Sequence, residues 1–203
     1  MEAKRDIRRR LRNRRRRIPA GERRRAELRL RDETLRLVET QGVQRVAGYL
    51  DADGEAPTGA ILNALHQRGQ AIYLPALRRQ CRRMGFRRWA PEAPLRPNRY
   101  GVPEPPPGLA AELPVRDLDL VLAPLVAFDP AGRRLGMGGG FYDATFARLR
   151  RYPWHPPRIV GLAFSSQEVA QLPGDAWDLP LEGVITERGY VRLPVRTVGL
   201  GSA

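Results

Sequence analysis

Apolar positions repeat with two different periods along the chain. Near its start, Ile7, Leu11 and Ile18 recur at helical spacing until Pro19 interrupts the pattern. A second helical run follows and stops at Gly42. The apolar residues of this second run are Leu28, Leu35 and Val38. The pattern therefore predicts two consecutive helices at the start of the chain.

Further along, short and mainly apolar runs are typical of buried strands. Their ranges are 43–50, 71–77, 118–128, 158–164, 183–186 and 189–193. Residues 82–89 alternate loosely, with Met84, Phe86 and Trp89, and predict a further strand. Helical spacing predicts a helix over 59–68, with Thr58 as its N-cap and Gly69 as its stop. A further helix is predicted over 142–151, with Phe146 and Leu149 on one side, and one helical turn over 165–171. Because strand, helix and strand alternate, we expect one α/β domain over residues 1–203, a three-layer sandwich with a mostly parallel central sheet flanked by helices.

Three loops between these elements carry polar chemistry. An acidic loop over 51–55 follows the first strand, at the edge where open α/β sheets bind ligands. The proline-rich stretch 91–114 is too long for an ordinary connection in a compact domain, so we interpret it as functional or disordered. A third loop over 172–181 carries Asp175 and Asp178.

The stretch from Gly132 to Asp143 reads GRRLGMGGGFYD and lies between a predicted strand and a predicted helix. Glycines let backbone N–H groups approach an anion closely, and the neighbouring arginines Arg133 and Arg134 can neutralise phosphate. No Gly-Lys-Ser/Thr follows, so the stretch is not a P-loop, and Phe141 excludes the dinucleotide fingerprint. The alternative to an anion site is a flexible turn.

Composition adds a strong positive charge, +14 in total. Residues 1–36 hold 16 Lys/Arg against 6 Asp/Glu, so a basic helical segment (residues 1–41) is expected to attract polyanions. We interpret most of its arginines as a solvated helix face and expect the Arg14–Arg17 cluster to matter little to any chemistry. RNA binding through this helix is the alternative, although no RRM, KH or zinc-finger pattern follows.

The rarer residue types exclude several classes of protein. The single Cys81 excludes an intrachain disulfide framework, and with only His66 and His155 beside it a structural zinc site is not expected. No apolar run approaches the roughly 20 residues that span a bilayer. The basic N-terminus also lacks the apolar region of a signal peptide. We expect a cytoplasmic monomer that does not bind membranes.

Five separated motifs resemble the 5-formyltetrahydrofolate cyclo-ligase (5,10-methenyltetrahydrofolate synthetase) family, in order and over nearly the whole chain. The most specific is the glycine-rich stretch, and the others are weaker alone. The remaining four are Lys4-Arg5-Asp6-Ile7-Arg8, Leu50 followed by Glu55, Arg99-Tyr100-Gly101-Val102-Pro103-Glu104-Pro105, and Trp177-Asp178-Leu179-Pro180.

The resemblance implies ATP-dependent conversion of 5-formyltetrahydrofolate, or of its polyglutamate, to 5,10-methenyltetrahydrofolate, ADP and phosphate. It implies catalytic roles for Arg134 and Tyr142, and Mg²⁺ on Asp143 and Asp178. Expected ATP contacts are Lys4, Arg5, Arg8, Arg133, Arg134, Leu135, Gly136, Met137, Gly138, Gly139, Gly140 and Phe141. Expected folate contacts are Leu50, Glu55, Met84, Phe86, Tyr100 and Tyr142; for Met84 and Phe86, core packing is an equal alternative.

Two positions depart from the family pattern. Some members carry Lys where this chain has Gly139, and many carry Tyr where it has Phe141, so a lysine and a hydroxyl are absent there. A sugar-phosphate isomerase or CoA-transferase relative is a further alternative. It would need its own nucleophile or base, and none is evident in the sequence.

Overall fold

The structure is a computed structural model that describes residues 2–78, 81–108, 112–147, 156–175 and 177–194. Its helices are α1 (Lys4–Arg16), α2 (Ala20–Thr40), α3 (Gly59–Gln67) and α4 (Phe141–Phe146), with short 3-10 helices at Val115–Asp117 and Ser165–Gln167. Its strands are β1 (Arg45–Ala47), β2 (Ala71–Leu77), β3 (Met84–Trp89), β4 (Arg96–Pro97), β5 (Pro103–Glu104), β6 (Glu112–Leu113), β7 (Leu120–Pro124), β8 (Ala127–Phe128), β9 (Arg134–Leu135), β10 (Arg158–Leu162), β11 (Gly183–Thr186) and β12 (Gly189–Arg192).

The main sheet has eight strands in the order β12-β11-β10-β7-β1-β2-β3-β6. The five strands from β11 to β2 run parallel, and the strands at both edges pair antiparallel. The chain moves from β1 outward to β2 on one side, and from β7 outward to β10 and β11 on the other. The order therefore reverses between β1 and β7, the kind of switch point where open α/β sheets bind ligands.

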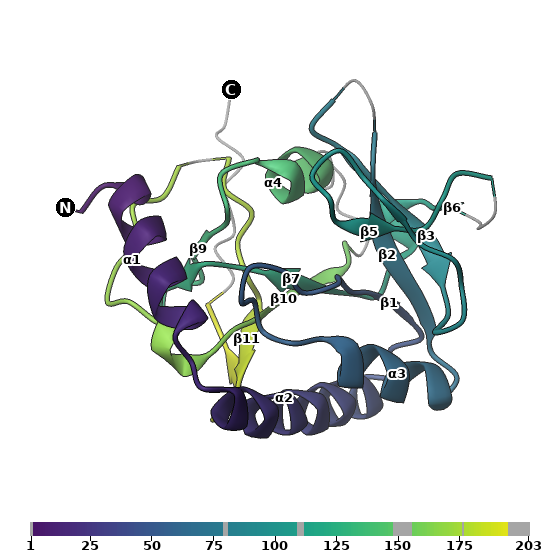
Figure 1. Ribbon diagram of the computed structural model, residues 1–203, viewed down its shortest axis with the longest axis horizontal. Coiled ribbons are helices and arrows are strands. Elements are labelled where there is room, and N and C mark those ends of the chain that lie inside the picture. Colours follow the sequence, from purple (N-terminus) through teal and green to yellow (C-terminus); the bar gives the residue numbers. More distant parts are fainter. Residues whose placement is uncertain (1, 79–80, 109–111, 148–155, 176, 195–203) are drawn as a thin grey trace.

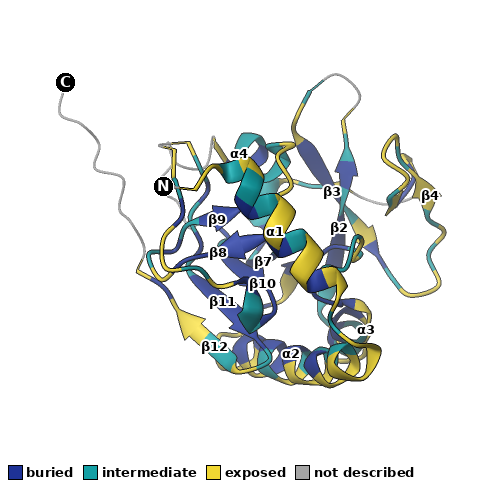
Figure 2. Ribbon diagram, turned by 60° about the vertical axis from the view of Figure 1, so that its left-hand side comes forward, coloured by how far each residue is buried: buried dark blue, intermediate teal, exposed yellow. Residues whose placement is uncertain are grey.

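Helices cover both faces of this sheet (Figure 1). Along β7, Leu120 and Leu122 pack with α2 and α3 on one face, whereas Val121 and Ala123 pack with Phe146 of α4 on the other. Because both faces are covered, the central strands are mainly apolar and deeply buried, apart from the arginines that begin β1 and β10 (Figure 2). The predicted α/β fold with a mostly parallel sheet between helices is confirmed.

Helix α1 lies beside the sheet and packs on a small third cluster (Figure 1). Its Ile7 and Leu11 are buried against Val126, Ala127 and Leu135, and each contributes about 2 kcal/mol by leaving water. Asp6 in the first turn and arginines in the last turn both suit the helix dipole. Helix α1 is thereby fixed against the β8–β9 hairpin, which leads into the glycine-rich stretch.

Several expected elements differ in detail. The apolar run 118–128 forms two strands, because β8 leaves the main sheet to pair antiparallel with β9. Thr58 stands at the N-cap of α3, but its hydroxyl donates to the Tyr49 carbonyl at 2.6 Å instead of capping. Leu28 is 45% exposed, because it lies about 200° around α2 from the buried Leu30. Residues 148–151 of the predicted helix, Leu149 included, lie outside the described residues. Among the residues that are described, no helix is both long and apolar enough to cross a bilayer.

Candidate active site

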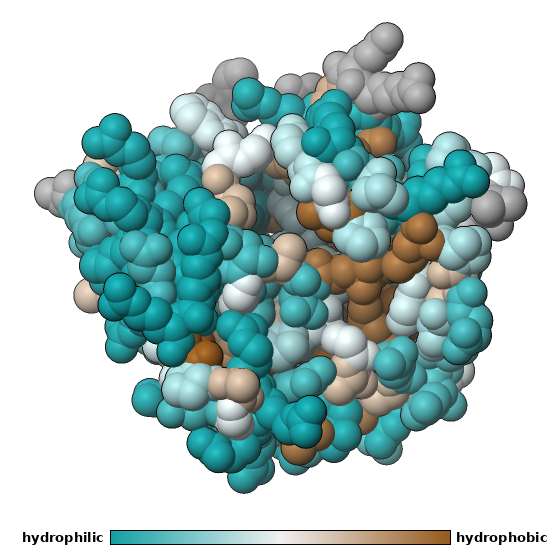
Figure 3. All heavy atoms as spheres, in the orientation of Figure 1, coloured by the Kyte–Doolittle hydropathy of each residue, from teal (hydrophilic) through white to brown (hydrophobic). Residues whose placement is uncertain are grey.

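A cavity of about 630 Å³ opens at the carboxyl ends of β1, β2 and β7, next to the switch point. This volume lies within the range of small-molecule sites. Figure 3 shows the hollow near the middle of one face, with hydrophilic surface on one side of it and hydrophobic surface on the other. The lining comes from segments far apart in sequence, among them the start of α1, the acidic loop, β2 and β3, the proline-rich loop, the glycine-rich stretch and the loop over 172–181.

The glycine-rich stretch forms one wall, which we call the glycine wall (residues 134–143). Gly138 and Gly140 have φ of 100° and 66°, values that glycine adopts without strain. The Arg8 guanidinium holds this loop by donating from Nε to the Gly136 carbonyl at 2.8 Å. Among the described contacts, no backbone N–H of residues 136–140 donates a hydrogen bond. The loop therefore presents several free donors beside a cation.

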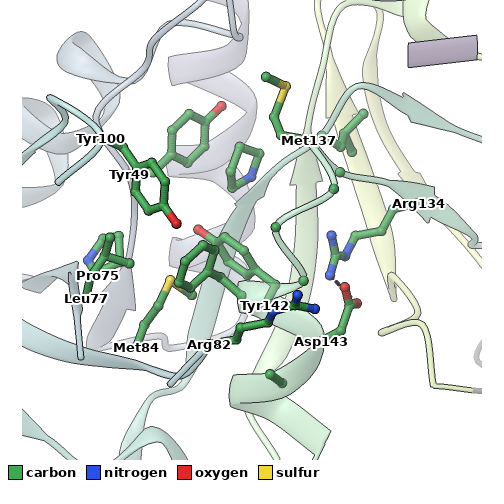
Figure 4. Close-up of a pocket in the computed structure, with 18 of the residues that line it drawn as sticks. Tyr49, Pro75, Leu77, Arg82, Met84, Tyr100, Arg134, Met137, Tyr142 and Asp143 are labelled. Carbon is green, nitrogen blue, oxygen red and sulfur yellow. Dashed lines mark hydrogen bonds and ion pairs between the residues drawn. The ribbon is translucent and has the colours of Figure 1, made fainter. Parts of the chain in front are cut away.

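Three polar side chains lie at the centre of the glycine wall: the charged Arg134 and Asp143, and the neutral Tyr142 (Figure 4). Arg134 is 7% exposed and donates from Nη2 to Asp143 Oδ1 at 2.6 Å, while its guanidinium lies 5.5 Å from the Tyr142 ring centre. Arg134 Nε and the Tyr142 hydroxyl are buried and have no hydrogen-bond partner in the described structure. Burial raises the pKa of Tyr142, so its phenol keeps its proton. Both groups can donate to an acceptor that enters the cavity.

The acidic loop forms the opposite wall, which we call the acidic wall (residues 51–55). Glu55 lines the cavity with a side chain that is 13% exposed. Burial raises its pKa, although the Ala52 N–H and the nearby Arg15 act in the other direction. Asp53 is partly buried, but hydrogen bonds from Arg12 and Arg16 outweigh this and lower its pKa to about 2. The acidic wall is thus held by arginines of α1.

Flat and apolar side chains line the hydrophobic part of the cavity. Leu50, just before the acidic wall, also lines it. Met84 reaches it from β3, and Tyr100 lies over it from the proline-rich loop (Figure 4). Tyr100 is 62% exposed, and its ring meets Phe141 edge-on with centres 5.9 Å apart. The proline-rich loop is fastened to the sheet, because Glu104 accepts the Leu77 N–H at 3.0 Å. An aromatic ring can enter between these side chains.

Three of the expected site residues do not line the cavity. The Arg5 side chain is 88% exposed and near Asp6. Arg133 turns away from the cavity and donates to the Leu172 carbonyl at 2.5 Å. Phe86 is 0% exposed in the core, with its ring centre 6.0 Å from that of Phe146. The neighbours Arg133 and Arg134 reach different partners, the Leu172 carbonyl and the Asp143 carboxylate. Phe86 shares one face of β3 with Met84, but Phe146 of α4 packs against it.

The other expected residues do gather around the cavity. They are Lys4, Arg8, Leu50, Glu55, Met84, Tyr100, Arg134, Leu135, Gly136, Met137, Gly138, Gly139, Gly140, Phe141, Tyr142, Asp143 and Asp178. Further lining residues were not predicted as site residues; they include Tyr49, Pro75, Leu77, Arg82, Asn98 and Trp177. The sequence did place these residues near the carboxyl ends of predicted strands or in loops that carry the family-like motifs, which are positions where a ligand site is expected.

The two carboxylates expected to hold Mg²⁺, those of Asp143 and Asp178, differ in their hydrogen-bond partners. Asp143 uses one oxygen, Oδ1, for both Arg134 and the Leu179 N–H, which leaves Oδ2 without a partner in the described structure. Asp178 Oδ2 accepts hydrogen bonds from Lys4 Nζ at 3.0 Å and from the Asp175 N–H. The described residues contain no group of three or more metal-ligating side chains. Since Mg²⁺ is commonly held by one or two carboxylates together with substrate phosphates, the free oxygen of Asp143 fits such a site.

The basic helix is more tightly paired than a solvated face. Of the Arg14–Arg17 cluster, Arg14 and Arg17 are exposed, whereas Arg15 is 0% exposed and Arg16 binds Asp53. Arg15 is therefore an exception to the interpretation of most of these arginines as a solvated helix face.

Comparisons with known proteins agree with one another. A model of the 5-formyltetrahydrofolate cyclo-ligase family matches residues 1–187. The 5-formyltetrahydrofolate cyclo-ligase of Haemophilus influenzae is 37% identical over 161 residues, 79% of this chain and 84% of that protein. The one from Escherichia coli is 40% identical over 142 residues, covering 70% and 76%. The solved 5,10-methenyltetrahydrofolate synthetase of Aquifex aeolicus superposes with a TM-score of 0.78 at 29% identity, covering 94% and 92%.

Proposed function

The chain belongs to the 5-formyltetrahydrofolate cyclo-ligase family, and we propose that it converts 5-formyltetrahydrofolate and ATP to 5,10-methenyltetrahydrofolate, ADP and phosphate. The observation that carries the proposal is the pair of unpartnered buried donors, Arg134 Nε and the Tyr142 hydroxyl, beside the free N–H groups of the glycine wall. A buried donor without a partner costs about 1–3 kcal/mol, which an oxyanion bound in the cavity would recover.

The chemistry of the reaction explains why such donors are needed. The formyl oxygen is a poor leaving group, so N10 of the folate cannot displace it directly. Transfer of the γ-phosphoryl group to that oxygen converts it into phosphate, which leaves when N10 closes the ring. Phosphoryl transfer depends mainly on positioning and charge stabilisation, and these are what Arg134, Arg8 and the loop N–H groups supply.

ATP would bind at the glycine wall of the cavity, and the folate would bind at the acidic wall. Arg8 of α1 binds the glycine wall, and Lys4 lines the same cavity beside Asp175 and Asp178. Both cations would bind ATP phosphates. Glu55 would accept hydrogen bonds from the amino and ring N–H groups of the pterin, while Leu50, Met84 and Tyr100 would enclose its flat ring. Tyr142 lies between these sets, near both Glu55 and Arg134, where the formyl group would meet the γ-phosphate.

Asp143 would hold Mg²⁺ through its free oxygen, and the ion would neutralise charge on the ATP phosphates. The ion pair with Arg134 orients the Asp143 carboxylate at the same time. Asp178 would stay in its ion pair with Lys4 at the rim of the site. A cytoplasmic location agrees with the use of ATP and with a single cysteine. The oligomeric state, a polyglutamate tail and RNA binding stay predictions.

The test is the absorbance of methenyltetrahydrofolate formed from 5-formyltetrahydrofolate by purified protein. Product is expected only when ATP and Mg²⁺ are both present, and ADP should form in equal amount. Folded protein that gives no product, or equal product without ATP, would refute the proposal.

A further inference from the structure

Arg15 is a buried cation that the proposed reaction does not use. It lies in the last turn of α1 with an exposure of 0%. Its guanidinium donates to the Asp53 carboxylate and carbonyl, both at 3.1 Å, and to the Leu125 carbonyl at 3.1 Å. It also lies 3.9 Å from a Glu55 carboxylate oxygen and 3.7 Å from the Met137 sulfur. One side chain thus contacts the acidic wall, the end of β7 and the glycine wall.

The acidic loop around Asp53 needs such support. Asp53 has a φ of 53°, which an ordinary side chain rarely adopts, so its backbone is strained. Arg12 and Arg16 of α1 bind the same carboxylate. Arg23 of α2 holds the loop from the other side, donating to the Glu55 carbonyl at 2.7 Å and to the Gly54 carbonyl at 3.0 Å. The backbone that carries Glu55 is therefore fixed by arginines.

Arginine at position 15 has a cost that stability alone does not explain. Moving a cation out of water costs several kcal/mol, and apolar side chains of similar size often replace a buried ion pair with no loss of stability. What a guanidinium adds is direction, because its planar fork donates to several acceptors at fixed angles. Here those acceptors belong to segments on both sides of the cavity.

We propose that Arg15 is a positioning residue, which aims the Glu55 carboxylate at the pterin by tying the acidic loop to β7 and to the glycine wall. The inference rests on the proposed function, since it takes Glu55 to bind the folate. Arg15 itself, being fully buried, does not contact either substrate.

The test compares Arg15→Met and Arg15→Lys with Arg14→Met, an exposed arginine next to it on the same helix. Arg15→Met is expected to raise the KM for 5-formyltetrahydrofolate roughly tenfold, the size of one lost charge-assisted hydrogen bond. The KM for ATP and kcat should change by less than about threefold, because the ATP contacts stay in place. Arg15→Lys should raise the folate KM by an intermediate factor, since one ammonium cannot reach all three acceptors. Arg14→Met should match the wild type.

Melting curves first establish which variants are folded. A wild-type folate KM in folded Arg15→Met overturns the inference. If Arg15→Met does not fold, Arg15→Lys decides, and an unchanged folate KM in that variant overturns it. An equal rise in Arg14→Met would also overturn it, because the effect would then be general charge attraction. No product from folded wild-type protein refutes the proposed function and this inference together, whereas wild-type turnover with unchanged Arg15 variants refutes the inference alone.

Discussion

The glycine wall and the acidic wall of the cavity are built in opposite ways. On the glycine wall, Arg134 Nε, the Tyr142 hydroxyl and the loop N–H groups have no partner in the described structure. On the acidic wall, Asp53 binds three arginines and the loop backbone is held by a fourth. Since buried polar groups are normally paired, unpaired donors indicate where a ligand binds, and a fully paired network indicates what holds a ligand-binding residue in place.

The largest expected effect is on kcat, and it should distinguish two adjacent arginines, Arg134 and Arg133. Arg134→Met should lower kcat about 10²–10³-fold, because it removes a cation from the site of phosphoryl transfer. Arg133→Met should leave kcat within about threefold, since Arg133 donates to the Leu172 carbonyl outside the cavity and the loss falls on stability. Steady-state kinetics and melting temperatures of both variants measure this. Equal losses of kcat in the two variants would remove the distinction between them.

A smaller effect is expected from the acidic wall. Glu55→Gln should raise the KM for 5-formyltetrahydrofolate about tenfold or more, because hydrogen bonds to a charged acceptor are lost. The KM for ATP should stay within about twofold. Because burial disfavours the ionised form of Glu55, the variant should also melt at a higher temperature at neutral pH. An unchanged folate KM would show that Glu55 does not bind the pterin.

The protonation of Glu55 gives a pH dependence of defined sign. Burial raises the pKa of Glu55, so the carboxyl becomes protonated at a higher pH than an ordinary glutamate does. The carboxylate that accepts the pterin N–H groups is present above this pKa and is lost as the pH falls through it. We expect kcat/KM for the folate to decline with acid through that range, and the decline to disappear in Glu55→Gln. Persistence of the same acid limb in the variant would assign it to another group.

The smallest effect on catalysis is expected in the core. Phe86→Leu should lower the free energy of unfolding by about 1–2 kcal/mol, because a buried ring that packs on Phe146 is truncated. Both KM values should match the wild type, since Phe86 lies behind the cavity and not in it. Thermal melting and steady-state kinetics measure the two quantities. A raised folate KM at unchanged stability would return Phe86 to the substrate site.

The sequence predicted those helices and strands in which the apolar positions follow one clear pattern. The apolar run over residues 71–77 matches β2 at both ends, and most of the predicted site residues line one cavity. It could not separate Arg133 from Arg134, because these neighbours differ only in the partner that each side chain reaches. It could not separate Met84 from Phe86, because both lie on one face of β3 and only the packing of Phe146 covers Phe86. It missed Arg15 for another reason. Arg15 lies four residues after Leu11 and three before Ile18, so helical spacing places it on the apolar face of α1, but its charge favoured the interpretation of a solvated position.

The most direct test of the account follows the formyl oxygen. 5-Formyltetrahydrofolate carrying a heavy oxygen isotope in the formyl group would be turned over with ATP, and the released phosphate analysed by mass spectrometry. Phosphorylation of the formyl oxygen predicts that each phosphate released carries one heavy oxygen. Phosphate without the label, formed at the same rate as methenyltetrahydrofolate, would contradict the transfer of the phosphoryl group to the substrate and with it the role given to the glycine wall.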